Sequence, residues 1–416
     1  MTEKTMSGSH DADQDEAVRA LYEGFPYPVV LPDLDAVIAG AKVPLWNPVD
    51  SAALYFPELP ARRDLDILVA GCGTTVAPVL AAYIPEARIV GIDVSQSSLD
   101  LSQQHAERHG LTNIELRQLA LEDAAQLGKS FDFVHCHGVL HHLADPTAGL
   151  RALGGVLKDG GALSIMVYAT YGRAGLYMLQ ELCQRLGLQV NEQDGQKAQD
   201  LLVQLPPGHP FSMIHAERQQ RIAIPEVMDM LLHPRDVSYT TDGVRQLVDS
   251  AGLKFHRWLG QAQYTPGLSG LVSAGLGPEL ASQDPWEQAA IAELFLGTLI
   301  KHEFVVTQDH RRTPAELFQG DGLLHAIPVL APHLIVEQDG AVVRLANSAH
   351  QVPFQLSGDV GHFAPILQAI DGKSSVQQQL DARPETASSQ SPERALALDT
   401  LRQLYFSDLI ELRVGP

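Results

Sequence analysis

The 416-residue sequence is poor in cysteine, in basic residues and in long apolar runs. Its three cysteines, Cys72, Cys136 and Cys183, form no CxxC pair and cannot build a disulfide framework, so we expect a reducing compartment, the cytoplasm. The 29 Lys and Arg against 50 Asp and Glu give a formal net charge of −21. This balance argues against DNA as a partner, because phosphate neutralisation needs clustered basic residues. No run approaches the roughly 18 apolar residues of a membrane span, and the polar, acidic start predicts no signal peptide.

The composition is that of a packed globular protein, with 45% apolar and 19% charged residues. At roughly 150 residues per domain, the length predicts two or three domains. We expect an N-terminal helix and lid segment (1–60), a central domain (61–310) with a helical insertion (171–235), and a small C-terminal domain (311–416).

The N-terminal segment combines one short helix with aromatic residues. Val18, Leu21, Tyr22 and Phe25 recur at helical spacing, and the prolines of FPYPVVLPDL then end the helix. Two interpretations stay open: the segment packs on the next domain, or it forms part of a lid over a ligand site.

Short apolar runs alternate with helical stretches from residue 64 onward. This alternation predicts βαβ units and a parallel sheet with helices on both faces. The fold class is therefore α/β, with a doubly wound, Rossmann-like sheet of seven strands. The expected strands lie at 65–71, 87–94, 114–121, 131–140, 162–169, 254–260 and 303–308.

The C-terminal part has a different character, and predicts a small α+β, winged-helix-like domain. It contains a hairpin pattern with the turn pair Asp339–Gly340, followed by short helices. From residue 331 it carries 6 basic against 10 acidic residues, which disfavours DNA docking. Peptide or protein recognition, homodimerisation and a structural cap all remain open for it.

A glycine-rich turn follows the first expected strand and carries the chemistry. Gly71 and Gly73 allow the backbone to approach a ligand, and the next helix offers free N–H groups. Asp93 ends the second strand, 22 positions after Gly71, where a carboxylate can accept both hydroxyls of a ribose. Dinucleotide enzymes and S-adenosylmethionine enzymes both use this arrangement. Val76 stands where the GxGxxG fingerprint needs its last glycine, so the dinucleotide fingerprint is incomplete.

Further motifs follow in order: Asp123-Ala124 after the third strand, GVLHHL from Gly138, and the turn Leu157–Gly161 before the fifth strand. Together with the glycine turn and Asp93, this set resembles the class I S-adenosylmethionine-dependent methyltransferases. The resemblance implies S-adenosyl-L-methionine as cofactor and methyl transfer to an acceptor that the sequence does not identify, a peptide, a protein side chain or a small molecule. The cofactor-binding residues that it implies are Ala70, Gly71, Cys72, Gly73, Asp93, Val94, Glu122, Asp123, Ala124 and His137.

Two positions depart from the family pattern. Val69 stands where the family often has an acidic residue, and Thr75 where it often has glycine. Another group, for example from the N-terminal segment, would then hold the cofactor's amino group. A non-catalytic, cofactor-binding regulatory protein is the alternative function, and a nicotinamide oxidoreductase is a third.

The segments YEGFPYP, MVYATYGRAGLYMLQEL and LLHPRDVSYT are also similar to a bacterial methyltransferase subgroup with an extra C-terminal domain, which includes regulated protein methyltransferases. No substrate is transferred from that similarity.

Histidine and tyrosine side chains near the ends of strands four and five are the catalytic candidates. His141 or His142 is a candidate general base, and Tyr168 a candidate for acceptor contact. Packing is the alternative for all of them. His135 and His137 alternate on one face of a buried strand, and with no second ligand cluster at a suitable spacing we predict no metal site.

Two further groups of polar residues have two possible roles each, contact with the acceptor or a structural role. Tyr171 and Arg173 follow strand five and would otherwise anchor the insertion. The second group comes just before a helical stretch and comprises His233, Arg235, Asp236 and Tyr239. The alternative to acceptor contact is that these residues cap the start of that helix and form a local ion pair.

Overall fold

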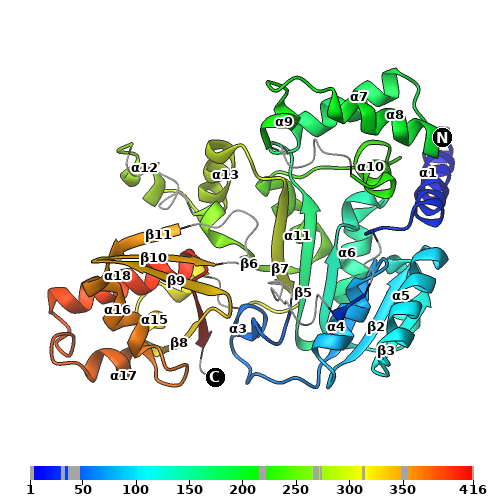
Figure 1. The fold of residues 1–416 in the computed structure, drawn as a ribbon. Coiled ribbons are helices and arrows are strands. Elements are labelled where there is room, and N and C mark those ends of the chain that lie inside the picture. The colour runs from blue at the N-terminus through cyan, green and yellow to red at the C-terminus, as the bar shows by residue number, and fades with distance from the viewer. Residues whose placement is uncertain are drawn as a thin grey trace. The chain divides into compact units, whose positions relative to one another are not determined.

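The computed structural model describes residues 4–29, 33–35, 47–214, 222–265, 271, 274–311, 314–347 and 355–414. Its main feature is a seven-stranded sheet in the order β3-β2-β1-β4-β5-β7-β6, which confirms the predicted Rossmann-like fold (Figure 1). Strands β1 to β5 pair in parallel, whereas β6 pairs with β7 in the antiparallel direction. The strands are β1 (Asp66–Ala70), β2 (Arg88–Asp93), β3 (Ile114–Gln118), β4 (Phe131–His137), β5 (Leu157–Tyr168), β6 (Lys254–Trp258) and β7 (Lys301–Thr307).

The central strands are buried on both faces, as their uninterrupted apolar sequences require. In β1, Ile67, Leu68, Val69 and Ala70 are all fully buried. The helices α4 (Val76–Tyr83), α5 (Gln96–Arg108), α6 (Pro146–Gly155) and α11 (Thr241–Ala251) follow or precede these strands. The N-termini of α5, α6 and α11 are capped by side chains that accept backbone N–H bonds, as Asp145 does for α6.

The insertion after β5 is helical, with a small core of its own. It consists of α7 (Ala174–Arg185), α8 (Glu192–Val203), α9 (Pro210–Ile214) and α10 (Ile224–Leu231), drawn together in green in Figure 1. Leu179, Phe211 and Met228 are buried in that core. Gly175 lets α7 approach α9 closely, because a Cβ there would lie 2.2 Å from the backbone nitrogen of Phe211.

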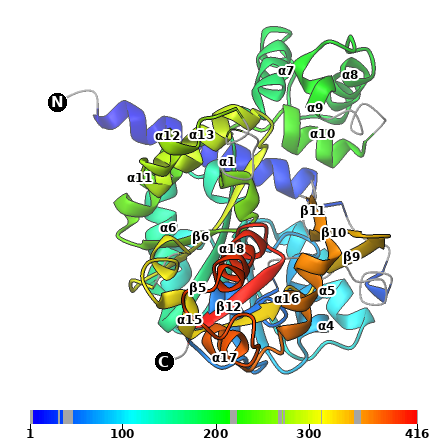
Figure 2. The same ribbon diagram turned by 90° about the vertical axis from the view of Figure 1, so that its left-hand side faces the viewer.

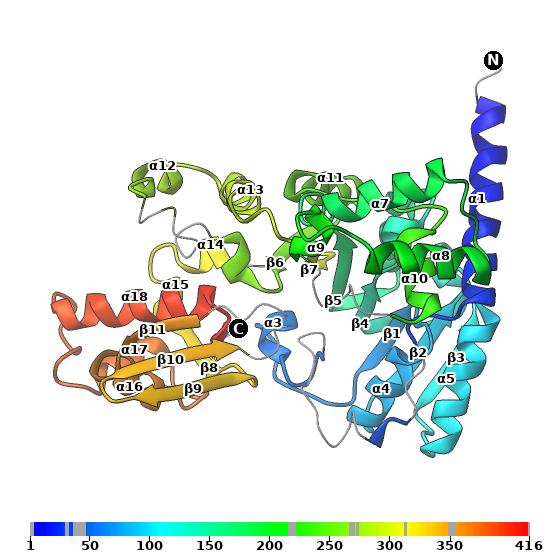
Figure 3. The same cartoon turned by 45° about the horizontal axis from the view of Figure 1, so that its top comes forward.

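The N-terminal helix α1 (Lys4–Gly24) is longer than the short helix that the spacing of Val18, Leu21, Tyr22 and Phe25 predicts. It stands beside α8 and α10 in Figure 3, and its C-terminal end reaches α5. The short helix α3 (Ala52–Tyr55) follows later in the chain.

The C-terminal part is an α+β unit with two small sheets, β11-β10-β9 and β12-β8. Figure 2 shows its helices and strands together. The hairpin of β9 and β10 turns at Gly340 and Ala341, one residue beyond the predicted turn pair, because Asp339 still pairs with Val342. A winged-helix arrangement is not confirmed. The strands are β8 (Ala326–Leu330), β9 (Leu334–Asp339), β10 (Val342–Asn347), β11 (Gln355–Asp359) and β12 (Ile410–Val414). The helices are α14 (Pro314–Leu317), α15 (Gly322–His325), α16 (Val360–Ala369), α17 (Val376–Asp381) and α18 (Pro392–Phe406).

Contacts divide the chain into two compact units. The first comprises 1–39, 64–253 and 296–303, and includes strands β1 to β5. The second comprises 40–63, 254–295 and 304–416, and includes β6, most of β7, α12 (Gly277–Ala281), α13 (Pro285–Leu296) except its last residue, and the C-terminal elements. The predicted domain boundaries stay a prediction. In the described part of the chain, no helix combines the length and apolarity that crossing a membrane requires.

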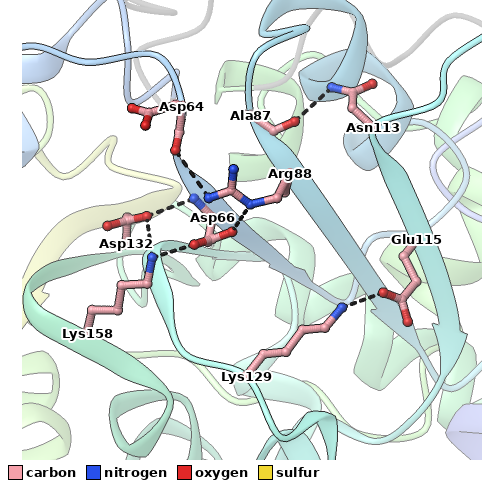
Figure 4. Close-up of polar contacts among 9 residues, drawn as sticks. All are labelled: Asp64, Asp66, Ala87, Arg88, Asn113, Glu115, Lys129, Asp132 and Lys158. Atoms are coloured by element: carbon pink, nitrogen blue, oxygen red, sulfur yellow. Dashed lines mark hydrogen bonds and ion pairs between the residues drawn. The ribbon is translucent and has the colours of Figure 1, made fainter.

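An ion-pair network ties together the N-terminal ends of four neighbouring strands (Figure 4). Asp66 of β1 pairs with Arg88 of β2 and with Lys158 of β5. Lys158 also lies 2.9 Å from Asp132 of β4, which accepts the Asp66 backbone N–H at 2.8 Å. The network lies at the opposite edge of the sheet from the glycine turn, so its role is to hold the strands.

Replacing Asp66 with asparagine is expected to lower the free energy of unfolding by about 1 kcal/mol at neutral pH. The hydrogen bond from Arg88 is the main cause that lowers the Asp66 pKa from 3.8 to about 2. Because the folded-state pKa is depressed, this stabilisation is complete above roughly pH 5 and disappears as the pH falls toward 2. The value is smaller than the pKa shift alone implies, since Arg88 is 62% exposed and solvent screens the pair.

Urea unfolding of the Asp66→Asn variant across that pH range measures the effect. Glu181→Gln is the matched control, because Glu181 pairs with Arg185 on an exposed helix face. The control should change stability by less than about 0.5 kcal/mol. A difference between wild type and Asp66→Asn that is as large at pH 2 as at pH 7 would contradict this account.

Candidate functional site

The turn after β1 is shaped by two glycines in left-handed backbone conformation. Gly71 has φ 68° and Gly73 has φ 55°. A Cβ on Gly71 would lie 2.3 Å from Val139 Cγ2, and one on Gly73 would lie 2.6 Å from the carbonyl oxygen of Tyr27. Only glycine therefore fits these positions without displacing a neighbour. The result is a narrow backbone cradle at the carboxyl end of the sheet.

Asp93 faces this cradle from the end of β2. One carboxylate oxygen accepts the Gly73 N–H at 2.9 Å, and the other accepts the Ser95 N–H at 2.9 Å. Burial is the main cause that raises the pKa of Asp93, although these backbone donors oppose it. The strand-end carboxylate and the glycine turn are thus adjacent, as their spacing in the sequence predicts.

A cavity of about 670 Å³ opens beside these groups. Eight of the predicted cofactor residues line it: Gly71, Cys72, Gly73, Asp93, Val94, Glu122, Asp123 and His137. Ala70 and Ala124 are fully buried and are not part of its lining. The glycine cradle, the carboxylate beside it and the adjoining space fit an adenosyl cofactor with an amino-acid tail. The role of each residue stays a prediction.

The N-terminal segment forms one wall of the cavity. Asp15, Glu16, Arg19 and Tyr22 of α1 line it, together with Tyr27 and Pro28. The segment is anchored at the cradle, where Thr74 Oγ1 donates to the carbonyl oxygen of Pro28 at 2.6 Å. This placement is the one that a lid would have.

Glu23, at the end of α1, forms hydrogen bonds with the start of α5. Its carboxylate accepts the backbone N–H groups of Gln96 at 2.7 Å and Ser97 at 3.0 Å. The Ser97 hydroxyl donates to it as well, and this bond is the main cause that lowers the Glu23 pKa. An acidic side chain thus satisfies the free N–H groups at a helix N-terminus.

A buried carboxylate also lines the cavity. Asp229 of α10 accepts the Tyr22 hydroxyl at 2.8 Å and the Tyr168 hydroxyl at 3.4 Å. Burial raises the pKa of Asp229, and burial together with Asp229 raises the pKa of both tyrosines. No arginine or lysine pairs with Asp229 among the ion pairs found in the described residues.

Two histidine rings stack beside Asp229. The rings of His142 and His233 have centroids 3.8 Å apart and planes 25° apart. The backbone of Arg235 contacts both: its carbonyl oxygen lies 2.7 Å from His142 Nδ1, and its N–H donates to His233 Nδ1 at 3.1 Å. Burial is the main cause that holds the pKa of His233 well below its usual value.

His141 lies beneath the ring of Tyr168 rather than on the cavity surface. The two ring centroids are 3.9 Å apart, and His141 is fully buried. The Arg173 guanidinium covers the Tyr168 ring, 3.4 Å from its centroid, and pairs with Asp236 at 3.3 Å. Tyr168, which lines the cavity, is therefore held in place by its contacts with His141 and Arg173.

The histidines of β4 point along one face of the strand, as the alternation predicts. The rings of His135 and His137 lie 4.0 Å apart, and His137 Nε2 lies 2.8 Å from the Ser164 hydroxyl. Burial lowers the pKa of His135 to about 3 and keeps the pKa of His137 low, so both rings are neutral.

The polar cluster before α11 reaches distant segments rather than its own helix start. Arg235 pairs with Asp15 of α1 at 2.6 Å, and Asp236 pairs with Arg173. Tyr239 N–H donates to the Tyr168 carbonyl oxygen at 2.8 Å. The alternative of a purely local ion pair is not what the structure shows.

Tyr22 and Asp229 are site residues that the sequence analysis missed as a pair. They are 207 positions apart, and no local motif links them. One signal was available: Asp229 is a single buried acid in the largely apolar helix IPEVMDML, where an acid needs a partner.

His142, Asp229 and His233 together offer three metal-ligating side chains, with ligand atoms within 4.8 Å of one another. The hydrogen bonds count against a metal. Because Nδ1 of His233 accepts an N–H, the neutral ring carries its proton on Nε2, where a metal needs a lone pair. That leaves two ligands, fewer than structural or catalytic metal sites use.

Comparison with known proteins identifies the class. A family model described as a methyltransferase domain matches residues 68–163. The chain is 32% identical over 330 residues to an uncharacterized protein of Synechococcus sp., and the match covers 76% of each chain. It is 39% identical over 123 residues to a ubiquinone biosynthesis O-methyltransferase of Cereibacter sphaeroides, covering 30% of this chain and 45% of that one.

Among solved structures, PKMT2 from Rickettsia typhi in complex with AdoHcy has the same fold, with a TM-score of 0.59 and 15% identity. The match covers 89% of this chain and 75% of that one. The chain therefore belongs to the family of the Synechococcus protein, and it contains a methyltransferase domain with the class I fold. The methyltransferase domain, the glycine turn and Asp93 fit S-adenosyl-L-methionine as the cofactor.

Replacing Asp93 with asparagine is expected to weaken binding of S-adenosylhomocysteine by more than about tenfold. The carboxylate accepts two backbone N–H groups and, with cofactor bound, would also accept the ribose hydroxyls. An amide turns one of those acceptors into a donor. Isothermal titration calorimetry measures the loss, and Asp100→Asn on α5, outside the cavity lining, is the control. Equal affinity for S-adenosylhomocysteine in the Asp93 and Asp100 variants would contradict a role of Asp93 in cofactor binding.

Proposed function

We propose that this methyltransferase acts on an acceptor that loses a proton during the reaction, with His142 as the general base. The observation that carries the proposal is His142, a residue that lines the same cavity as Asp93 and the glycine turn and whose Nε2 has no hydrogen-bond partner. His142 Nδ1 lies 2.7 Å from a carbonyl oxygen and so carries the ring proton, which leaves a lone pair on Nε2.

The cofactor, when bound, supplies an electrophilic sulfonium methyl group, so the protein's part is positioning and proton removal. Gly71, Gly73 and Asp93 would hold the cofactor at the carboxyl end of the sheet. Holding the acceptor in line with the methyl group is worth roughly 7–11 kcal/mol. A positioned base adds about 10²- to 10⁴-fold in rate.

Tyr168 and Asp229 would orient the acceptor. The Tyr168 hydroxyl and the Asp229 carboxylate face the cavity beside His142. His141, under the Tyr168 ring, acts through that ring as a positioning residue. Because Asp229 comes from the insertion, that segment takes part in recognising the acceptor, which is a small molecule or a peptide or protein side chain that enters the cavity. We place the reaction in the cytoplasm, since all three cysteines are free and buried.

Incubation with methyl-labelled S-adenosylmethionine and size-fractionated cell extract tests the proposal. We expect the wild type to label one fraction, and the Asp93→Asn variant to label it far more weakly. If calorimetry shows S-adenosylhomocysteine binding while no fraction is labelled, the chain is a non-catalytic cofactor-binding protein, the alternative function. If neither cofactor form binds and a nicotinamide cofactor raises the melting temperature instead, the methyltransferase assignment fails.

A further inference from the structure

The cavity beside the glycine turn is rich in acidic side chains and poor in basic ones. Among the described residues that line it, six are acidic and only Arg19 of α1 carries a permanent positive charge. The six acids are Asp15, Glu16, Asp93, Glu122, Asp123 and Asp229. Burial is the main cause that raises the pKa of Asp93, Glu122 and Asp229. A ligand that brings a carboxylate into such a cavity needs a positive charge to pair with it.

The backbone donors of the glycine turn are already engaged within the protein. The N–H groups of Gly71 and Cys72 donate to the Ile92 carbonyl oxygen at 2.8 and 3.0 Å. The Gly73 N–H donates to Asp93 at 2.9 Å. These three N–H groups are therefore not available to the carboxylate of an amino-acid tail that rests against the turn. A side chain of the cavity lining is the expected partner of that carboxylate.

Helix α1 holds Arg19 at the cavity between two fixed points. Asp15, one turn earlier, pairs with Arg235 at 2.6 Å, and Glu23, one turn later, accepts the Gln96 N–H at 2.7 Å. Residues four apart lie on the same face of a helix, so Arg19 lies on the face that carries both anchors. Within the described ranges, the exposed Arg19 side chain forms neither an ion pair nor a hydrogen bond of its own.

We propose that Arg19 binds the α-carboxylate of the cofactor's amino-acid tail. The inference rests on the cofactor of the proposed function and does not depend on the acceptor. A guanidinium group offers N–H donors in a rigid fork that matches the two oxygens of a carboxylate. The tail also carries an amino group, and the same stretch of α1 brings Asp15 and Glu16 to the cavity. One helix therefore offers a partner for each charge of the tail.

This contact makes the position of α1 depend on the bound cofactor. The Tyr22 carbonyl oxygen accepts the Ser95 hydroxyl at 3.1 Å, and the Pro28 carbonyl oxygen accepts the Thr74 hydroxyl at 2.6 Å. A ligand contact at Arg19 adds to these bonds and stabilises the packed position of α1. At saturation, S-adenosylhomocysteine should therefore slow amide hydrogen exchange along α1 more than its decarboxylated analogue does.

The main test measures by isothermal titration calorimetry how the full chain binds three nucleosides with different tails. S-adenosylhomocysteine carries an amino group and a carboxylate, its decarboxylated analogue carries only the amino group, and methylthioadenosine carries neither. Arg19→Met removes the charge of the side chain and should weaken S-adenosylhomocysteine binding by at least about tenfold. It should leave methylthioadenosine affinity within about twofold of wild type, which shows that the cavity is intact. The decarboxylated analogue should bind the variant as tightly as the wild type or more tightly, because a repulsion of its ammonium group is removed.

Two further variants separate the fork from the charge and from surface effects. Arg19→Lys keeps the charge but loses the fork, so its affinity for S-adenosylhomocysteine should lie between those of wild type and Arg19→Met. Arg185→Met is the matched control, because Arg185 is an exposed arginine of α7 outside the cavity lining, and it should bind all three nucleosides as the wild type does.

Equal weakening of S-adenosylhomocysteine and its decarboxylated analogue by Arg19→Met would overturn the assignment of Arg19 to the carboxylate. An S-adenosylhomocysteine affinity of Arg19→Met within about twofold of wild type would overturn it as well. Failure of the wild type to bind any of the three nucleosides would instead contradict the cofactor of the proposed function.

Discussion

Gly73→Ala should lower the affinity for S-adenosylhomocysteine by at least about 100-fold, which corresponds to roughly 2.7 kcal/mol. The added Cβ would lie 2.6 Å from the Tyr27 carbonyl oxygen and 2.8 Å from Pro28 Cδ. Both neighbours belong to the segment that closes the cavity, so this segment or the glycine turn has to move. Either movement also disturbs the hydrogen bond from Gly73 N–H to Asp93. Calorimetry with the wild type and the variant gives the affinity ratio.

Gly110→Ala separates this effect from the cost of the backbone conformation. Gly110 has φ 62°, close to the 55° of Gly73, but no atom lies within 4 Å of where its Cβ would be. Each substitution should cost roughly 1–2 kcal/mol of stability for the left-handed conformation. Only Gly73→Ala should lose cofactor affinity. If both variants bind S-adenosylhomocysteine as the wild type does, the cradle does not hold the cofactor's tail.

The cofactor side of the site was predictable because its parts are local in the sequence. Gly71 and Gly73 end one strand, and Asp93 ends its neighbour in the sheet. Parallel strands bring their carboxyl ends to one edge, so spacing alone places the carboxylate beside the glycine turn. The sheet was predictable as well, because short uninterrupted apolar runs are typical of parallel strands that are buried on both faces.

The acceptor side was not predictable in the same way. Tyr22 meets Asp229 across 207 positions, and Arg235 meets Asp15 across 220. Such pairs depend on how the insertion and α1 pack, and hydrophobic periodicity carries no information on that packing. His141 and His142 show the same limit. They are adjacent in the sequence, yet His142 lines the cavity while His141 packs under Tyr168.

Helix α1 connects the two sides of the cavity. The Tyr22 hydroxyl reaches Asp229, and the Tyr22 carbonyl oxygen accepts the Ser95 hydroxyl at 3.1 Å, next to the Asp93 loop. Glu23 adds its bonds to the start of α5. Val69, where the family often has an acid, is fully buried and is not part of the cavity lining. These contacts make α1 a structural element of the site, and its acidic residues Asp15 and Glu16 are candidates to replace the missing acid.

His142→Gln should lower the rate of methyl transfer by about 10²- to 10⁴-fold while leaving S-adenosylhomocysteine affinity within about twofold of wild type. Glutamine is similar in size and its amide can still bond the Arg235 carbonyl oxygen, but it cannot take a proton from the acceptor. Single-turnover transfer from labelled S-adenosylmethionine to the acceptor fraction measures the chemical step, separately from binding and product release.

His105→Gln is the matched control for this substitution. His105 is also buried, both its ring nitrogens lack a hydrogen-bond partner, and it does not line the cavity. A general loss of rate in both variants would indicate destabilisation by any buried histidine replacement. A rate within a few-fold of wild type in His142→Gln would mean that the acceptor's proton leaves by another path. A loss of rate confined to His142→Gln, with S-adenosylhomocysteine affinity unchanged, supports proton transfer from the acceptor to His142 Nε2.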